Sequence, residues 1–75
     1  MLLERLSREQ SGPLTSRELD VARLIGFGLT NGEVASRLHI STKTASVHVS
    51  NILRKLDMSS RAEVAAWAAQ EGLLE

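Results

Sequence analysis

The chain has no cysteine and no tyrosine, and only one phenylalanine, one tryptophan and one proline among its 75 residues. Without cysteine, neither a disulfide framework nor a thiolate metal site can form, and nothing indicates an oxidising compartment. No apolar run is long enough for a membrane span or a secretory signal, so we expect a soluble protein of the cytoplasm. A chain of this length buries only about 60% of its unfolded surface, which predicts one core and one domain.

The residues that catalysis requires are also scarce. The two histidines, His39 and His48, stand apart from any HExxH motif and from any serine, histidine and aspartate grouping. His48 falls beside an apolar stripe, which favours a packed structural residue over a ligand. Gly26-Phe27-Gly28 lacks the lysine and the strand context of a phosphate-binding loop. The sequence therefore predicts no enzyme activity, no cofactor and no metal site.

Charge is balanced over the whole chain but unevenly distributed along it. Nine lysines and arginines match nine aspartates and glutamates, so the formal net charge is zero. Residues 34–56 nevertheless contain no acid, and Arg37, Lys43, Arg54 and Lys55 all lie within them. This separation predicts one basic face, which is the electrostatic signature of a nucleic-acid partner.

Helix start and stop signals divide the chain into four helical segments, and no strand is predicted. Capping boxes of the form Thr/Ser-x-x-Glu begin at Thr15, Thr30 and Ser60, and Ser41 is a further N-cap candidate. His39 occupies a turn that often needs a left-handed residue, a conformation that histidine tolerates better than branched residues do. We predict an all-α domain at residues 14–75 after an N-terminal tail or residual linker at 1–13, with helices at Ser16–Phe27, Asn31–Leu38, Thr42–Leu56 and Arg61–Glu71.

The predicted helix at residues 42–56 has two unlike faces. One is an apolar stripe that must be buried, made of Ala45, Val49, Ile52, Leu53 and Leu56. The opposite face has no acid, short hydroxyl side chains in its middle and cations toward its ends; it comprises Lys43, Ser46, Val47, Ser50 and Arg54. Short polar side chains can approach base edges, cations reach phosphates, and a valine can pack on a thymine methyl group. Alternatively, the valine is an ordinary exposed apolar residue.

A short helix and a turn of about three residues precede this face, which is the spacing of a helix-turn-helix. Several motifs at matching positions resemble the LuxR-type helix-turn-helix, namely the segments Leu14–Leu19, Gly28–Ala35 and Ile40–Leu56. The resemblance covers Leu14 to about Leu73 and implies a four-helix DNA-binding domain that is also found in NarL/FixJ response regulators. It implies base reading by Ser46, Val47 and Ser50, and backbone contacts by Thr30, Asn31, Lys43, Thr44, Asn51, Arg54 and Lys55. Serines at positions 46 and 50, where many members have lysine or arginine, predict weak guanine readout.

The last predicted helix has apolar residues on both sides. Its alanine face, with Ala62, Ala65, Ala66 and Ala69, is expected to pack closely on the core. This arrangement leaves Val64, Trp67, Ala68 and Glu71 for a partner, and the resemblance implies a homodimer. In the alternative, Trp67 covers the core of its own domain.

We therefore predict sequence-specific binding to double-stranded DNA by a C-terminal or stand-alone module of a bacterial LuxR-family transcription regulator. The expected form is a dimer on an inverted repeat, with RNA polymerase left open as a further partner and no membrane contact. Two alternatives remain: a promoter-recognition module like region four of a sigma factor, and a helical protein-interaction domain. An interaction module would show no steep salt dependence toward DNA.

Overall fold

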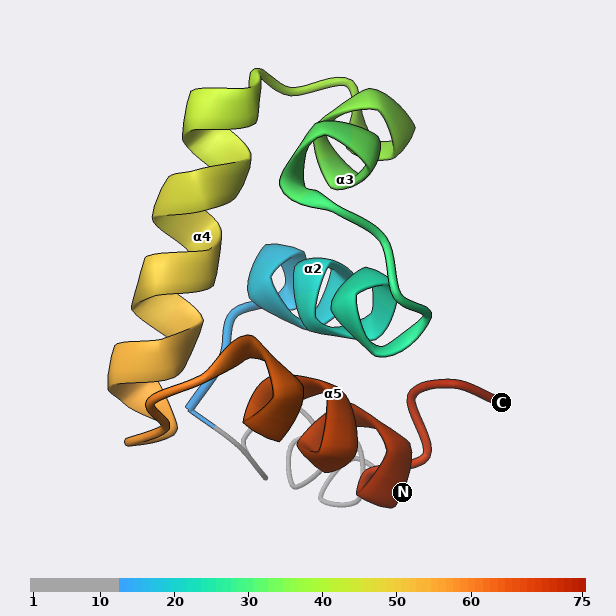
Figure 1. Cartoon of the computed structure of the whole chain (residues 1–75), viewed down its shortest axis with the longest axis vertical. Helices are drawn as coiled ribbons and strands as arrows, with labels where there is room; N and C mark the ends of the chain where they lie inside the picture. Colours follow the sequence, from blue (N-terminus) through green and yellow to red (C-terminus); the bar gives the residue numbers. More distant parts are fainter. Residues whose placement is uncertain (1–12) are drawn as a thin grey trace, which may run out of the picture.

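The computed structural model describes residues 13–75, which fold into four helices and no strand (Figure 1). The helices are α2 (Ser16–Gly26), α3 (Asn31–Leu38), α4 (Thr42–Lys55) and α5 (Arg61–Gln70). All four predicted helices are confirmed, and α2, α4 and α5 each end one residue earlier than predicted. The predicted tail lies outside the described residues except for Pro13. No helix within residues 13–75 has the length and apolar character to cross a membrane.

Each of the described helices begins at a side chain that accepts a hydrogen bond from the backbone three residues later. Thr15, Thr30 and Ser60 each form the complete capping box with the glutamate three positions on. Ser41 caps α4 alone, with its hydroxyl accepting from the Thr44 amide at 3.0 Å. The predicted N-caps are thus confirmed, because capping depends on residues close together in sequence.

The helices also end in one common way, with a left-handed residue after the last turn. These residues are Gly28 (φ 91°), His39 (φ 61°), Asp57 (φ 55°) and Gly72 (φ 75°). The next amide then donates to the carbonyl five residues back, as in Ile40 N to Ala35 O at 3.0 Å and Met58 N to Leu53 O at 2.8 Å. This is the Schellman arrangement, which satisfies carbonyls that the helix end would leave unpaired. The left-handed histidine is confirmed; the aspartate at 57 was not foreseen in this conformation.

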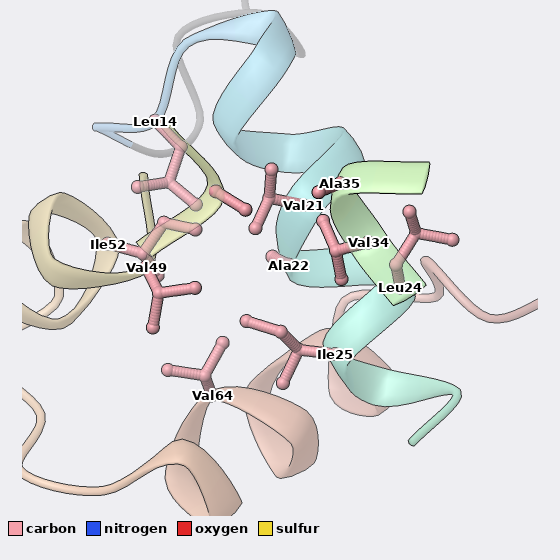
Figure 2. Packing of buried hydrophobic residues seen from close by; sticks show 11 residues of the cluster. Leu14, Val21, Ala22, Leu24, Ile25, Val34, Ala35, Val49, Ile52 and Val64 are labelled. Carbon is pink, nitrogen blue, oxygen red and sulfur yellow. The ribbon is translucent and has the colours of Figure 1, made fainter. Parts of the chain in front are cut away.

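The core lies around α2, which packs chiefly against α5 and α4, while α3 packs against α4. The four largest side chains that are fully buried each come from a different helix: Val21, Val34, Ile52 and Val64. Figure 2 shows them pointing toward a common centre, with Leu14 closing the core from the segment before α2. One such contribution from every helix fixes the position of α4 relative to the rest of the domain.

The predicted orientation of α5 is wrong. Val64 and Ala68 are fully buried in the core of their own domain; of the four alanines expected there, Ala65 is partly buried against the core and Ala62, Ala66 and Ala69 are exposed. The physical reason is a glycine on the facing helix: a Cβ at Gly26 would lie 3.1 Å from the Cβ of Ala68. The close approach therefore occurs at position 26 of α2 and draws in Ala68 with its neighbour Val64.

Two of the four residues expected at a partner interface are consequently unavailable to a partner. Trp67 is partly buried and packs against the core, as in the alternative considered above, and Glu71 is exposed. A dimer through α5 would have to use other residues of that helix.

Candidate nucleic-acid interface

One face of α4 is turned away from the rest of the domain. The helix runs along an edge of the molecule, with α2 and α3 on one side only (Figure 1). Ala45, Val49 and Ile52 are buried, and Leu53 and Leu56 are partly buried against the core, so the predicted apolar stripe is confirmed.

The opposite surface of α4 is exposed, and we call it the α4 outer face; it consists of Lys43, Ser46, Val47, Ser50 and Arg54. It contains no carboxylate, and its cations stand at the two ends with hydroxyl groups between them. Val47 is 50% exposed and, with Phe27 on the segment after α2, is one of two large apolar side chains exposed in residues 13–75. The arrangement can donate to and accept from polar edges, pack on a methyl group and neutralise anions at its ends.

The turn before α4 consists of residues 39–41 and joins two helices that pack on each other. The opposite end of α3 is capped by Thr30. The Thr30 hydroxyl accepts a hydrogen bond from the Glu33 amide at 3.1 Å, and the Thr30 amide donates to the Glu33 carboxylate at 2.8 Å. Thr30 is exposed and lies next to Asn31, which is half-buried. The predicted contact residues before α4 are therefore engaged in the start of α3.

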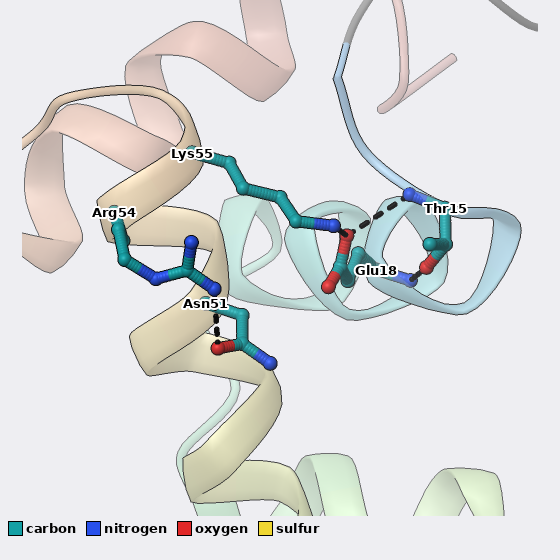
Figure 3. Close-up of polar contacts among 5 residues, drawn as sticks. All are labelled: Thr15, Glu18, Asn51, Arg54 and Lys55. Carbon is teal, nitrogen blue, oxygen red and sulfur yellow. Dashed lines mark hydrogen bonds and ion pairs between the residues drawn. The ribbon is translucent and has the colours of Figure 1, made fainter.

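Lys55 is held by α2 and does not belong to the α4 outer face. Its Nζ lies 2.8 Å from Oε1 of Glu18, whose side chain is only 6% exposed (Figure 3). The same oxygen accepts from the Thr15 amide at 2.9 Å. Burial acts to raise the pKa of the Glu18 carboxyl, but the Lys55 hydrogen bond and charge and the Thr15 amide together lower that pKa below its ordinary value. The carboxylate is thus a charged, internally satisfied group at neutral pH.

A second link of this kind joins α5 to the start of α3. Arg61 donates from Nη1 to Oδ1 of Asn31 at 2.8 Å and from Nη2 to the Leu29 carbonyl at 2.7 Å. Arg61 was not predicted as a site residue, because its partners lie 30 and 32 positions away in the sequence. A planar guanidinium that reaches two oxygens holds its partners in a defined geometry.

The remaining predicted contact residues lie along α4. Thr44 accepts a hydrogen bond from the Ser41 hydroxyl at 2.9 Å, and Arg54 donates to Oδ1 of Asn51 at 3.0 Å (Figure 3).

His48 is partly buried, and its Nδ1 is buried without a hydrogen-bond partner among residues 13–75. In the same range, no three side chains of metal-binding type come together.

Comparison with known proteins gives one family and a set of consistent relatives. The model of a family described as bacterial regulatory proteins, luxR family, matches residues 12–68. Proteins named response regulator protein VraR, from Staphylococcus aureus, Staphylococcus saprophyticus and Staphylococcus epidermidis, are each 44% identical over 62 residues, which is 83% of this chain. The chain spans 30% of the length of these relatives.

Proposed function

The chain belongs to the LuxR family of bacterial regulatory proteins, a family of DNA-binding transcription regulators and not of enzymes, and from this we propose how it binds DNA. In our proposal residues 14–75 form one domain that inserts α4 into the major groove of duplex DNA. Ser46, Val47 and Ser50 face base edges, while Lys43, Thr44, Asn51 and Arg54 contact the phosphate backbone. Thr30 and Asn31 contact the backbone from the start of α3.

The observation that carries this proposal is the composition of the α4 outer face. A solvated helix face ordinarily combines glutamate with lysine, because long charged side chains favour helices and pair one turn apart. The α4 outer face instead has hydroxyl groups and an exposed valine between two cations, and no acid. A helix with its side chains is about 10–12 Å across, which matches a major groove about 12 Å wide.

Salt dependence of duplex binding tests the proposal. The affinity of the unchanged chain for a mixed-sequence DNA duplex should fall on a log-log plot with a slope of about −0.9 for each phosphate neutralised. Lys43→Met should make this slope shallower, whereas Arg23→Met, which removes an exposed cation from α2, should leave it unchanged. An affinity that does not respond to salt would reject DNA binding and favour a protein-interaction domain.

We further propose that two copies pair through α5 and bind an inverted repeat. The exposed alanines Ala62, Ala66 and Ala69 lie along one stripe of α5, on the side away from the buried Val64 and Ala68. This stripe replaces the interface expected from the sequence, since Val64 and Ala68 belong to the core. Apolar atoms on an exposed helix are suited to burial against an identical helix.

Selection of binding sites from random duplexes tests the dimer. We expect two half-sites in inverted orientation, and we expect Ala66→Arg to abolish the preference for the pair while preserving binding to one half-site. A single asymmetric site would contradict the dimer, and a requirement for RNA polymerase would favour the sigma-like alternative. Because bacterial duplex DNA lies in the cytoplasm, the proposal places the protein there.

A further inference from the structure

We propose that Arg61 is a positioning residue for DNA binding, because its guanidinium orients the side-chain amide of Asn31 with the N–H donors toward the phosphate backbone. The inference rests on the proposed function, in which Asn31 contacts that backbone. Arg61 itself acts from α5 and binds no DNA. The two residues lie 30 positions apart in the sequence, and only the fold brings them together.

The two anchors of Arg61 stand on either side of Thr30, the N-cap of α3. Nη1 donates to the Asn31 side chain at 2.8 Å, and Nη2 donates to the main-chain carbonyl of Leu29 at 2.7 Å. One planar group thus bonds to one side-chain oxygen and one backbone oxygen at the same time. Because the backbone oxygen is fixed by the fold, the fork also fixes the side-chain oxygen relative to the start of α3.

The chemistry of the guanidinium decides which end of the amide turns inward. A guanidinium has only donors, so it can bond to Oδ1 of Asn31 but not to Nδ2. With the oxygen held on Arg61, the two N–H donors of the amide point to the other side and can serve another acceptor. A phosphate oxygen is an acceptor only, so this orientation suits it, whereas the opposite orientation would bring two oxygens together.

Arg61 is the first residue of α5 and is itself half-buried. Its charge also lies beside the N-terminus of α3, where the helix dipole favours an anion. The guanidinium charge and the orientation of the Asn31 amide both favour a phosphate at the start of α3. Only the orientation effect depends on Asn31. Removal of Asn31 should therefore remove the benefit of the guanidinium fork.

A double-mutant cycle on the 75-residue chain tests this inference, with a mixed-sequence duplex as the probe. Asn31→Ala should weaken binding about tenfold, as expected when one hydrogen bond to a charged group is removed. Arg61→Met should weaken binding by a similar factor alone but by much less in the Asn31→Ala background. The salt slope should be the same for Arg61→Met as for the unchanged chain, because Arg61 neutralises no phosphate.

Circular dichroism at the assay temperature shows whether each variant is folded. Asn31→Asp provides a second measurement that does not depend on losing the link to α5. It keeps an oxygen for Arg61 and places a carboxylate in the first turn of α3, so the thermal midpoint should hold or rise. Its affinity for DNA should nevertheless fall by more than that of Asn31→Ala, since the donors are gone and an anion faces the phosphate.

The outcomes separate the two proposals. Equal effects of Arg61→Met in both backgrounds, or a slope shallower by about 0.9, would mean that Arg61 contacts DNA directly and would overturn the inference. Unchanged affinity of folded Arg61→Met or of Asn31→Asp would overturn it as well. If the unchanged chain showed no salt-dependent binding, the proposed function would fail, and the inference would fail with it.

Discussion

Lys55 Nζ lies 2.8 Å from Glu18 Oε1, and this ion pair joins the last turn of α4 to the first turn of α2. Glu18 is the N3 residue of a capping box and is almost fully buried, so one carboxylate both completes a helix start and anchors a second helix. The chain contains a natural control: Thr30 and Glu33 form the same capping box at α3, but Glu33 is exposed.

Replacement of the two glutamates should reveal the added contribution of the ion pair. We expect Glu18→Ala to lower the free energy of unfolding by about 2 kcal/mol, because it removes the carboxylate that accepts from the Thr15 amide and leaves Lys55 without its partner. Glu33→Ala, which removes only the exposed hydrogen bond from the Thr30 amide to the Glu33 carboxylate, should cost about 0.5 kcal/mol. Urea unfolding followed by circular dichroism measures both; similar losses would show that the link to α4 contributes nothing.

The same carboxylate should make stability depend on pH. The pKa of Glu18 lies below its ordinary value of 4.5 in the folded chain. Above pH 4.5 the full contribution is present; below it the unfolded chain takes up a proton that the folded chain does not, so stability is lost as the pH falls through the lowered pKa. Glu18→Gln should be less stable than the unchanged chain at neutral pH, and the difference should shrink in acid. A difference that stays constant down to about pH 3 would contradict this assignment.

Lys55 and Arg54 are adjacent cations, but only Arg54 belongs to the α4 outer face. We expect Arg54→Met to make the salt slope of DNA binding shallower by about 0.9, because one phosphate fewer is then neutralised. Lys55→Met should leave the slope unchanged and reduce stability instead, because the Lys55 charge is directed at Glu18. Titration of both variants against one duplex at several salt concentrations measures the two slopes. A shallower slope for Lys55→Met would show that Lys55 also contacts the phosphate backbone.

Two glycines should respond oppositely to the same substitution. A Cβ at Gly26 would lie 3.1 Å from the Cβ of Ala68, which α5 holds in place, and 2.6 Å from the movable Cδ2 of Leu74, so Gly26→Ala should cost about 1 kcal/mol through overpacking against Ala68. At Gly32, the nearest atom to such a Cβ is the Thr30 hydroxyl oxygen at 3.9 Å. Gly32→Ala should therefore stabilise α3 by up to about 1 kcal/mol. Thermal unfolding of the two variants compares them, and a stable Gly26→Ala would show that α5 does not approach so closely.

Val47 is the test of base contact. Because it is half exposed, Val47→Ala should change the free energy of unfolding by less than about 0.5 kcal/mol. It should weaken binding to a selected site by about 1 kcal/mol and leave binding to a mixed-sequence duplex unchanged. The neighbouring Val49→Ala reverses the pattern, since that side chain is buried and its loss acts on stability. Equal weakening on both kinds of duplex would assign Val47 no role in sequence recognition.

The sequence predicted the features that depend on neighbouring residues. Helix starts were correct because the caps at Thr15, Thr30, Ser41 and Ser60 lie within three residues of their partners. The two faces of α4 were also correct, because the period of a helix determines which residues share a side. His39 follows the same rule, since its left-handed turn is a property of the local chain.

Apart from the left-handed turn at Asp57, the features that sequence reasoning missed depend on residues far apart. Which side of α5 is buried depends on the missing side chain at Gly26, which lets Ala68, more than 40 positions away in the sequence, pack closely against α2. Lys55 finds Glu18 across 37 positions, and Arg61 finds Asn31 across 30. A helical wheel shows that α5 has two apolar sides but not which of them meets a neighbour, so only the packed structure could assign them.

The uneven distribution of charge gives the domain an electric dipole, which can orient it before it makes contact with a charged partner. A chain of zero net charge is not drawn as a whole toward a polyanion, yet the α4 outer face carries the exposed Lys43 and Arg54 and no carboxylate, which makes that side positive relative to the rest. In the electric field of DNA, a neutral molecule with such a dipole is mainly rotated and experiences little net attraction. Under the proposed function, this dipole would turn the α4 side of the domain toward DNA, so that surfaces away from α4 would bind DNA of any sequence only weakly.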